Sequence, residues 1–238
     1  CQGEESVALR SSSTSKAGPS SRTPVPGSWT RALRTVTAAF FFSGVSALVY
    51  QVVWLRKLSA IFGNTTLAVS ITLTAFMAGL AIGSYALGRW ADRLERPLRW
   101  YAWLEILIGC YGLASLPLLG EVHSAYVALA ARLPYDSVAL ASFHFTTCFL
   151  ALVTPTALMG GTLPVALKGL VRRVEGVERE VGRLYGANTF GAALGVVLAG
   201  FLLLPVLGLR ATVHLAALIN MVIGLLVMRL DGRVTGAS

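Results

Sequence analysis

The sequence predicts an all-α, polytopic integral membrane protein with about six transmembrane helices. Hydrophobic residues make up 55% of the chain and charged residues only 13%, whereas about a quarter of the residues in a typical soluble domain are charged. Apolar runs follow one another through most of the chain, and a bilayer crossing takes about 20 helical residues. Lys and Arg fall in short groups between these runs, which is the arrangement that membrane topology produces.

Each apolar run except the fourth matches the length of one crossing. The runs are, in chain order, about 32–54, 65–88, 98–118, 137–170, 184–207 and 211–228. Residues 121–136, between the third and fourth runs, are expected to form a short interfacial helix. We therefore predict a six-helix transmembrane domain over residues 31–230.

The two ends of the chain are polar. Residues 1–30 are rich in Ser, Thr, Pro and Gly without apolar periodicity, so we predict a disordered tail. Residues 231–238 are expected to be a short cytoplasmic tail or the start of a linker. Cys1 is either the lipidated end of a processed lipoprotein or a sign of a fragment, and the charge pattern favours a fragment.

The basic residues also predict the orientation in the membrane. They precede the first run, fill the second and fourth connections and follow the sixth run, while the other connections hold only Arg56, Lys57, Arg132 and Arg210. Because cytoplasmic loops carry the excess of Lys and Arg, both termini are expected in the cytoplasm. We expect a multi-pass protein of the bacterial inner membrane. A nucleic-acid binder gathers its basic residues on one face, so nucleic acid is not an expected partner.

The fourth run contains Pro155, Gly160, Gly161 and Pro164. Proline and glycine interrupt helical hydrogen bonding, so the sequence predicts a helix break here. Discontinuous helices often shape the substrate sites of transporters, and a kink that serves packing alone is the alternative.

Four polar residues are candidates for a substrate path. Glu105 lies midway along the third run, where a carboxylate is costly and has either a substrate- or proton-linked role or a structural partner. Tyr50 and Gln51 lie near the outer end of the first run, as interfacial belt residues or as polar lining. Asn188, in the fifth run, either lines the path or forms interhelical hydrogen bonds.

Two further patterns concern helix ends and helix packing. Arg89, Asp92 and Arg93 form a cytoplasmic charge cluster, which either ties two helix ends together or is a solvated turn that sets topology. Small residues four apart on the second and fifth runs predict close helix contacts. These residues are Ala75, Gly79 and Gly83, and then Gly191 and Gly195.

No motif for chemistry is found. The sequence has no CxxC motif or Cys/His cluster, no Ser/His/Asp arrangement, no paired carboxylates and no phosphate-binding loop. We therefore predict no catalytic, cofactor-binding or metal-binding residues, and no cofactor.

Four stretches carry a resemblance to a known family: residues 41–70, 75–93, 155–170 and 184–209. Together they resemble the multi-spanning membrane proteins that are fused to a spermidine-synthase-like (aminopropyltransferase-like) domain. The charged turn at 88–97 and the six-run layout also resemble half of a major facilitator superfamily bundle. Family members commonly carry Glu after the Tyr of the first stretch, where this chain has Gln51.

The resemblance implies a membrane module that anchors a cytoplasmic aminopropyltransferase-like domain, in cis or in trans. It also implies handling of a polyamine-like cation, with Glu105 as the counter-charge. The catalytic half of such proteins is Rossmann-like, and no corresponding motif is present in this chain, so whether the protein is an enzyme stays open. The alternatives are a stand-alone half-transporter that forms a homodimer, and a structural scaffold whose main partner is the lipid bilayer.

Overall fold

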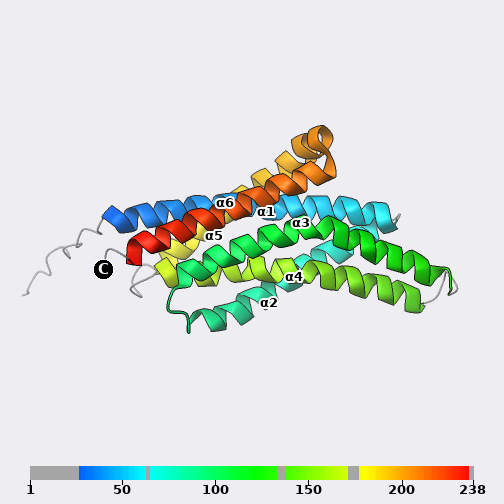
Figure 1. Ribbon diagram of the computed structural model, residues 1–238, viewed down its shortest axis with the longest axis horizontal. Coiled ribbons are helices and arrows are strands. Elements are labelled where there is room, and N and C mark those ends of the chain that lie inside the picture. Colours follow the sequence, from blue (N-terminus) through cyan, green and yellow to red (C-terminus); the bar gives the residue numbers. More distant parts are fainter. Residues whose placement is uncertain (1–26, 63–64, 133–137, 171–176, 236–238) are drawn as a thin grey trace, which may run out of the picture.

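The computed structural model describes residues 27–62, 65–132, 138–170 and 177–235. Within these ranges the chain forms helices and no strands, so the predicted all-α class is confirmed. The elements are α1 (Gly27–Phe62), α2 (Thr65–Ala91), α3 (Pro97–Ala130), α4 (Val138–Leu170), α5 (Val177–Leu198), the π-helical turn η1 (Ala199–Leu203) and α6 (Leu204–Thr235). They lie side by side as one elongated bundle (Figure 1).

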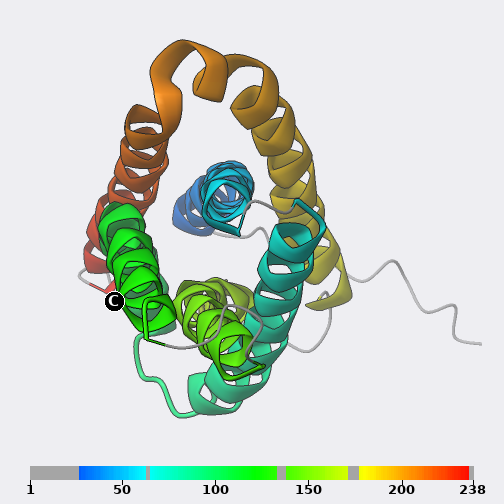
Figure 2. The same cartoon turned by 90° about the vertical axis from the view of Figure 1, so that its right-hand side faces the viewer.

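The described residues contain 5 helical stretches long and apolar enough to cross a membrane. The last stretch, Val177–Asp231, has 55 residues and would be roughly 80 Å long as a straight helix, far more than one crossing needs. Gly208 interrupts it with φ 75° and ψ 176°, a backbone conformation that suits glycine. The chain reverses there, so α5 and α6 lie on opposite sides of α1 (Figure 2). The stretch therefore supplies two antiparallel segments, and the bundle has six.

Large apolar side chains cover the outside of this bundle. Phe201 is 84% exposed, Phe190 71% and Val206 70%. An apolar surface of this kind is stable when it contacts lipid rather than water. The chain is thus a multi-pass membrane protein whose outer face contacts the bilayer.

The helices pair according to an exchange symmetry. The three most extensive contacts are α2 with α4, α1 with α5 and α3 with α6, followed by α3 with α4 and α1 with α6. Exchanging α1 with α4, α2 with α5 and α3 with α6 leaves this pattern unchanged. The halves α1–α3 and α4–α6 therefore share one packing plan, as the internal repeats of many transporter folds do.

Glycines form the α2–α4 contact. A Cβ at Gly79 would collide with Thr156, and one at Gly83 would collide with the backbone of Ala157. From the other side, a Cβ at Gly160 would collide with the backbone of Leu80. Backbone therefore lies directly against backbone, the arrangement by which small residues hold helices together in lipid.

The α1–α5 contact is built in the same way. Gly191 and Gly195 of α5 lie against the backbone of Phe41 and Val45, and Gly44 of α1 lies against the backbone of Asn188. Each contact thus has two glycines four residues apart on one helix and, on the other helix, a glycine that lies directly against backbone. The predicted close contacts at both glycine pairs are confirmed.

The predicted break in α4 is wrong, because α4 continues as a helix through Pro155 and Pro164. A proline lacks the N–H that would bond the carbonyl four residues earlier. Tyr111 of α3 donates to the carbonyl of Ala151 at 2.5 Å, and Ser84 of α2 donates to the carbonyl of Gly160 at 2.9 Å. Side chains of neighbouring helices thus replace both lost bonds, as the interior of a membrane protein requires.

The glycines of the predicted break have a packing role instead. Gly160 lies against Leu80, as described above, and a Cβ at Gly161 would collide with the side chain of Leu87. Both neighbours belong to α2, so the pair brings α2 and α4 together. The alternative interpretation of this stretch, helix packing, accounts for it without a break.

Two predicted boundaries also differ from the structure. Residues 121–130 continue α3, which runs through Pro117 to Ala130, so the separate interfacial helix is wrong. Helix α1 already begins at Gly27 and α6 ends at Thr235, so the bundle extends a few residues beyond 31–230 at both ends. The rest of the predicted tail, 1–26, lies outside the described residues.

Candidate functional site

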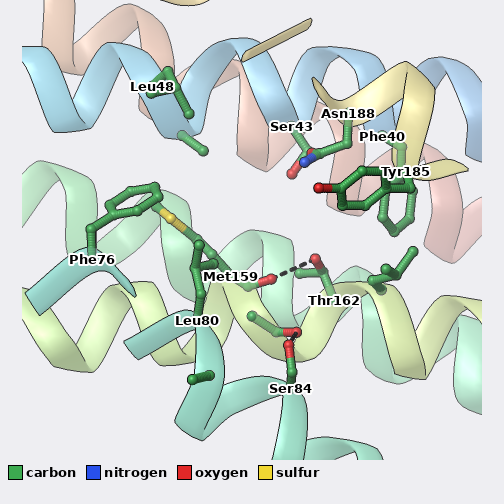
Figure 3. Close-up of a pocket in the computed structure, with 14 residues that line it drawn as sticks. Phe40, Ser43, Leu48, Phe76, Leu80, Ser84, Met159, Thr162, Tyr185 and Asn188 are labelled. Atoms are coloured by element: carbon green, nitrogen blue, oxygen red, sulfur yellow. Dashed lines mark hydrogen bonds between the residues drawn. The ribbon is translucent and has the colours of Figure 1, made fainter. Parts of the chain in front are cut away.

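A cavity of about 360 Å³ lies between the α1–α5 pair and the α2–α4 pair. The elements that line it are therefore those exchanged by the symmetry of the fold, and the cavity lies where the two halves meet. None of its lining residues carries a charge. Figure 3 shows side chains from all four helices directed toward this space.

One end of the cavity is polar. Ser43 of α1 and Asn188 and Tyr185 of α5 lie together there (Figure 3). Across the cavity, the hydroxyl of Thr162 donates to the carbonyl of Met159 at 2.7 Å and that of Ser84 donates to Gly160. Because these two hydroxyls use their protons within the protein, their oxygens remain available as acceptors.

The rest of the lining is apolar and partly aromatic. Phe40 and Phe76 contribute rings from α1 and α2, and Leu48, Leu80 and Met159 complete the wall (Figure 3). With the ring of Tyr185, three aromatic rings line this uncharged cavity. A site of this composition suits a ligand with an apolar body and a few polar groups.

A second polar group of residues lies deeper in the bundle, among α1, α3 and α6. Glu105 is fully buried and accepts a hydrogen bond from Nδ2 of Asn220 at 2.6 Å. Within the described residues, Glu105 Oε1, Asn220 Oδ1 and the Tyr101 hydroxyl have no hydrogen-bond partner. Unpartnered buried polar atoms are rare in folded proteins and point to a functional feature.

Ser43 connects these two places. Ser43 lines the cavity. Its side chain and that of Tyr101 also lie next to the Glu105 carboxyl group. Glu105 itself does not line the cavity. The buried carboxyl group is thus one residue away from the cavity.

The four predicted path residues do not form a single site. Asn188 lines the cavity, whereas Glu105 lies behind Ser43. Tyr50 is fully buried, stacks on Trp54 with ring centroids 5.4 Å apart and packs against Gly112. The interpretation of Tyr50 as an interfacial belt residue is wrong, because its side chain lies in the protein interior. Gln51 is half-buried and does not line the cavity.

The charge cluster is partly formed. Asp92, in the turn after α2, pairs with Lys168 of α4 at 3.5 Å, and this pair links two helix ends. Arg89 instead lies over the ring of Tyr85, with its Cζ 5.6 Å from the centroid. Arg93 donates its backbone N–H to the carbonyl of Trp90. The Asp92–Lys168 pair is well exposed, so its contribution to stability is small.

Several site residues escaped the sequence reasoning. Asn220 lies in the middle of an apolar run, so the rule that singled out Glu105 would also have found it. Ser43 and Thr162 are ordinary small polar residues of membrane helices. Phe40, Phe76 and Tyr185 look like lipid-facing residues until the helix pairs are known.

Comparisons with models of protein families, with curated proteins and with solved structures found no match to this chain. The described residues also contain no group of three or more His, Cys, Asp or Glu side chains that could hold a metal ion. The candidate site is therefore defined by its own geometry: an uncharged, aromatic cavity with a buried carboxyl group behind it.

Proposed function

We propose that this chain is a membrane module that binds a polyamine-like organic cation in the cavity between its two helix pairs. The observation that carries the proposal is the lining of that cavity. The lining contains aromatic rings and acceptor oxygens and no positively charged side chain. The resemblance to spermidine-synthase-like membrane proteins implies a ligand of the same class.

The chemistry of the lining favours such a cation over other small molecules. Ammonium groups interact favourably with aromatic rings, and Phe40, Phe76 and Tyr185 line the cavity. Hydroxyl and amide oxygens accept hydrogen bonds from ammonium N–H groups, and the apolar wall suits the methylene segments between them. A phosphate or carboxylate would need positive charges, which the lining lacks.

The resemblance further supports a role as an anchor. On this proposal the module holds an aminopropyltransferase-like domain at the cytoplasmic face of a bacterial inner membrane, in cis or in trans, with both termini on that side. The basic groups around Arg89–Arg99 and at Lys168 support this orientation. A reporter enzyme that works only outside the cytoplasm can be fused after residue 238. Activity of that fusion would contradict the proposed orientation.

Ligand binding is tested with the purified chain in lipid nanodiscs and radiolabelled spermidine. Tyr185→Leu and Phe76→Leu each remove one ring from the lining, and we expect either change to weaken binding roughly five- to thirtyfold, about 1–2 kcal/mol. Phe201→Leu is the matched control, because Phe201 is 84% exposed and outside the cavity.

The result that supports the proposal is saturable spermidine binding that the two lining variants weaken and the control leaves unchanged. Absence of saturable binding by the natural sequence contradicts the proposal. Equal binding by all three variants contradicts the assignment of the cavity.

A half-transporter is the second candidate function. The exchange symmetry of the helix pairs favours it, because transporters with internal repeats bind their substrates where the repeats meet. It predicts spermidine uptake into proteoliposomes that contain this chain alone, as a homodimer. Binding without uptake would favour the anchoring module. If the chain shows neither binding nor uptake, the structural scaffold is the function that remains.

A further inference from the structure

The buried pair of Glu105 and Asn220 is the least satisfied polar contact in the described part of the bundle. One hydrogen bond joins them, from Asn220 Nδ2 to Glu105 Oε2 at 2.6 Å. The other oxygen of each side chain, Glu105 Oε1 and Asn220 Oδ1, has no partner among the described residues. Both oxygens are acceptors, so neither can satisfy the other while Glu105 is ionised.

The surroundings offer the carboxyl group no positive charge. The groups that face it are the Ser43 hydroxyl on α1, the Tyr101 hydroxyl on its own helix and the Asn220 amide on α6. The Tyr50 hydroxyl of α1 is a further titratable group close enough to feel the charge of Glu105. No described Lys, Arg or His pairs with Glu105. An unpaired carboxylate is very costly at such a place in a membrane protein.

A single proton would satisfy both unpartnered oxygens. If Oε1 carries a hydrogen, it can donate to Asn220 Oδ1 while Nδ2 continues to donate to Oε2. Acid and amide then form a ring of two hydrogen bonds, and no charge remains buried. We propose that Glu105 holds an exchangeable proton in an acid–amide pair with Asn220, and that a cation entering the cavity releases this proton.

The second half of this inference rests on the proposed function. Ser43 lies beside Glu105 and also lines the cavity, and a hydroxyl group can accept one proton while donating another. A cation in the cavity, separated from Glu105 by Ser43, stabilises the ionised carboxylate because opposite charges attract strongly in a low-dielectric interior.

The exchange balances in atoms and charge. The O–H bond of Glu105 breaks, its electron pair stays on the carboxylate, and the proton leaves through the Ser43 hydroxyl to water in the cavity. One positive charge of the bound cation replaces the charge of the lost proton. Binding at this site is therefore coupled to proton release, which makes the cation's affinity depend on pH.

The proton itself is tested without any ligand, by infrared spectroscopy of the purified chain. We expect a carboxylic-acid C=O band at neutral pH that is missing from Glu105→Gln. Gln at this position keeps the ring of two hydrogen bonds with Asn220, so the variant should fold normally. Asn220→Leu should shift the band, because the acid then loses its amide partner. A spectrum unchanged in both variants would overturn the inference.

The coupling is tested with spermidine and a pH-indicator dye in weakly buffered solution. We expect the natural sequence to release about one proton per bound spermidine, with affinity rising up to about tenfold per pH unit. Glu105→Gln should bind without releasing protons, and with no such pH dependence. Phe201→Leu, outside both sites, should behave like the natural sequence.

The two proposals fail separately. Spermidine binding with no proton release, or with the same release from Glu105→Gln, would overturn the coupling and leave the proposed function standing. If no spermidine binds, the proposed function and the coupling both fail, while the infrared band still decides whether Glu105 holds a proton.

Discussion

The halves α1–α3 and α4–α6 share one packing plan but differ in the polar groups inside it. The α1–α5 and α2–α4 contacts both set two glycines four residues apart on one helix against a helix whose own glycine lies against backbone. Helix α4 carries Pro155 and Pro164 within its span, whereas its counterpart α1 carries no proline. At the α3–α6 contact, the exchanged helices contribute different partners, Glu105 from one half and Asn220 from the other.

The glycine contacts that hold the bundle together are therefore common to both halves, whereas the polar groups on which binding would depend are not. Close backbone contact is the same in both halves, because it depends only on small residues at a fixed spacing. The polar groups differ between the halves at two places. Two backbone carbonyls of α4 accept hydrogen bonds from other helices, and one half contributes a buried acid, Glu105. Three sets of variants test whether the two halves are held together in the same way.

The largest effect is expected at the glycine contacts. A methyl group at Gly83 or Gly195 would overlap the backbone of Ala157 or Val45, so Gly83→Ala and Gly195→Ala should each destabilise the bundle by about 1–3 kcal/mol or more. Gly186→Ala is the control, because nothing lies near a Cβ there. It should be neutral or stabilising by up to about 1 kcal/mol.

Thermal unfolding in detergent, followed by circular dichroism, measures these changes. Similar losses at Gly83 and Gly195 would support one packing plan for both halves. A loss confined to one of the two glycines would show that the halves are held together differently.

An intermediate effect is expected at the proline sites of α4. Ser84→Ala leaves the carbonyl of Gly160 without its donor and should cost about 1 kcal/mol of stability. Pro164→Ala restores the backbone N–H that Gly160 would otherwise bond. In the double variant the loss from Ser84→Ala should therefore be smaller than in the natural background.

The same unfolding assay gives the four stabilities of this double-mutant cycle. Thr154→Ala serves as the control, since its hydroxyl bonds the carbonyl of Leu150 within its own helix on an exposed face. Strictly additive losses from Ser84 and Pro164 would mean that Ser84 does not compensate for the proline.

The smallest effect is expected at the cytoplasmic end. Asp92→Asn removes the ion pair with Lys168, whose side chains are 78% and 44% exposed, and such pairs contribute about 0–1 kcal/mol. We expect a loss below about 1 kcal/mol that disappears in high salt. A loss as large as that at Gly83 would mean that the charged turn, rather than the glycine contacts, holds α2 against α4.

The pattern of apolar and basic residues was enough to predict the fold class of this protein and the approximate course of its helices. Apolar runs of crossing length follow from the thickness of the bilayer, and the turn between the fifth and sixth runs lies at Gly208, where it was expected. The spacing of Gly79 with Gly83 and of Gly191 with Gly195 predicted close contacts, because four residues bring small side chains to one helix face.

Contacts between helices that lie far apart in the chain became known only from the folded bundle. Pro155 and Pro164 did not break α4, since Tyr111 and Ser84 of other helices bond the freed carbonyls. Glu105 met Asn220, a residue 115 positions away, and the cavity arose where four helices surround Ser43 and Asn188. Local patterns fix where a helix runs, but partners depend on pairing, and pairing is settled only by the packing of the whole bundle.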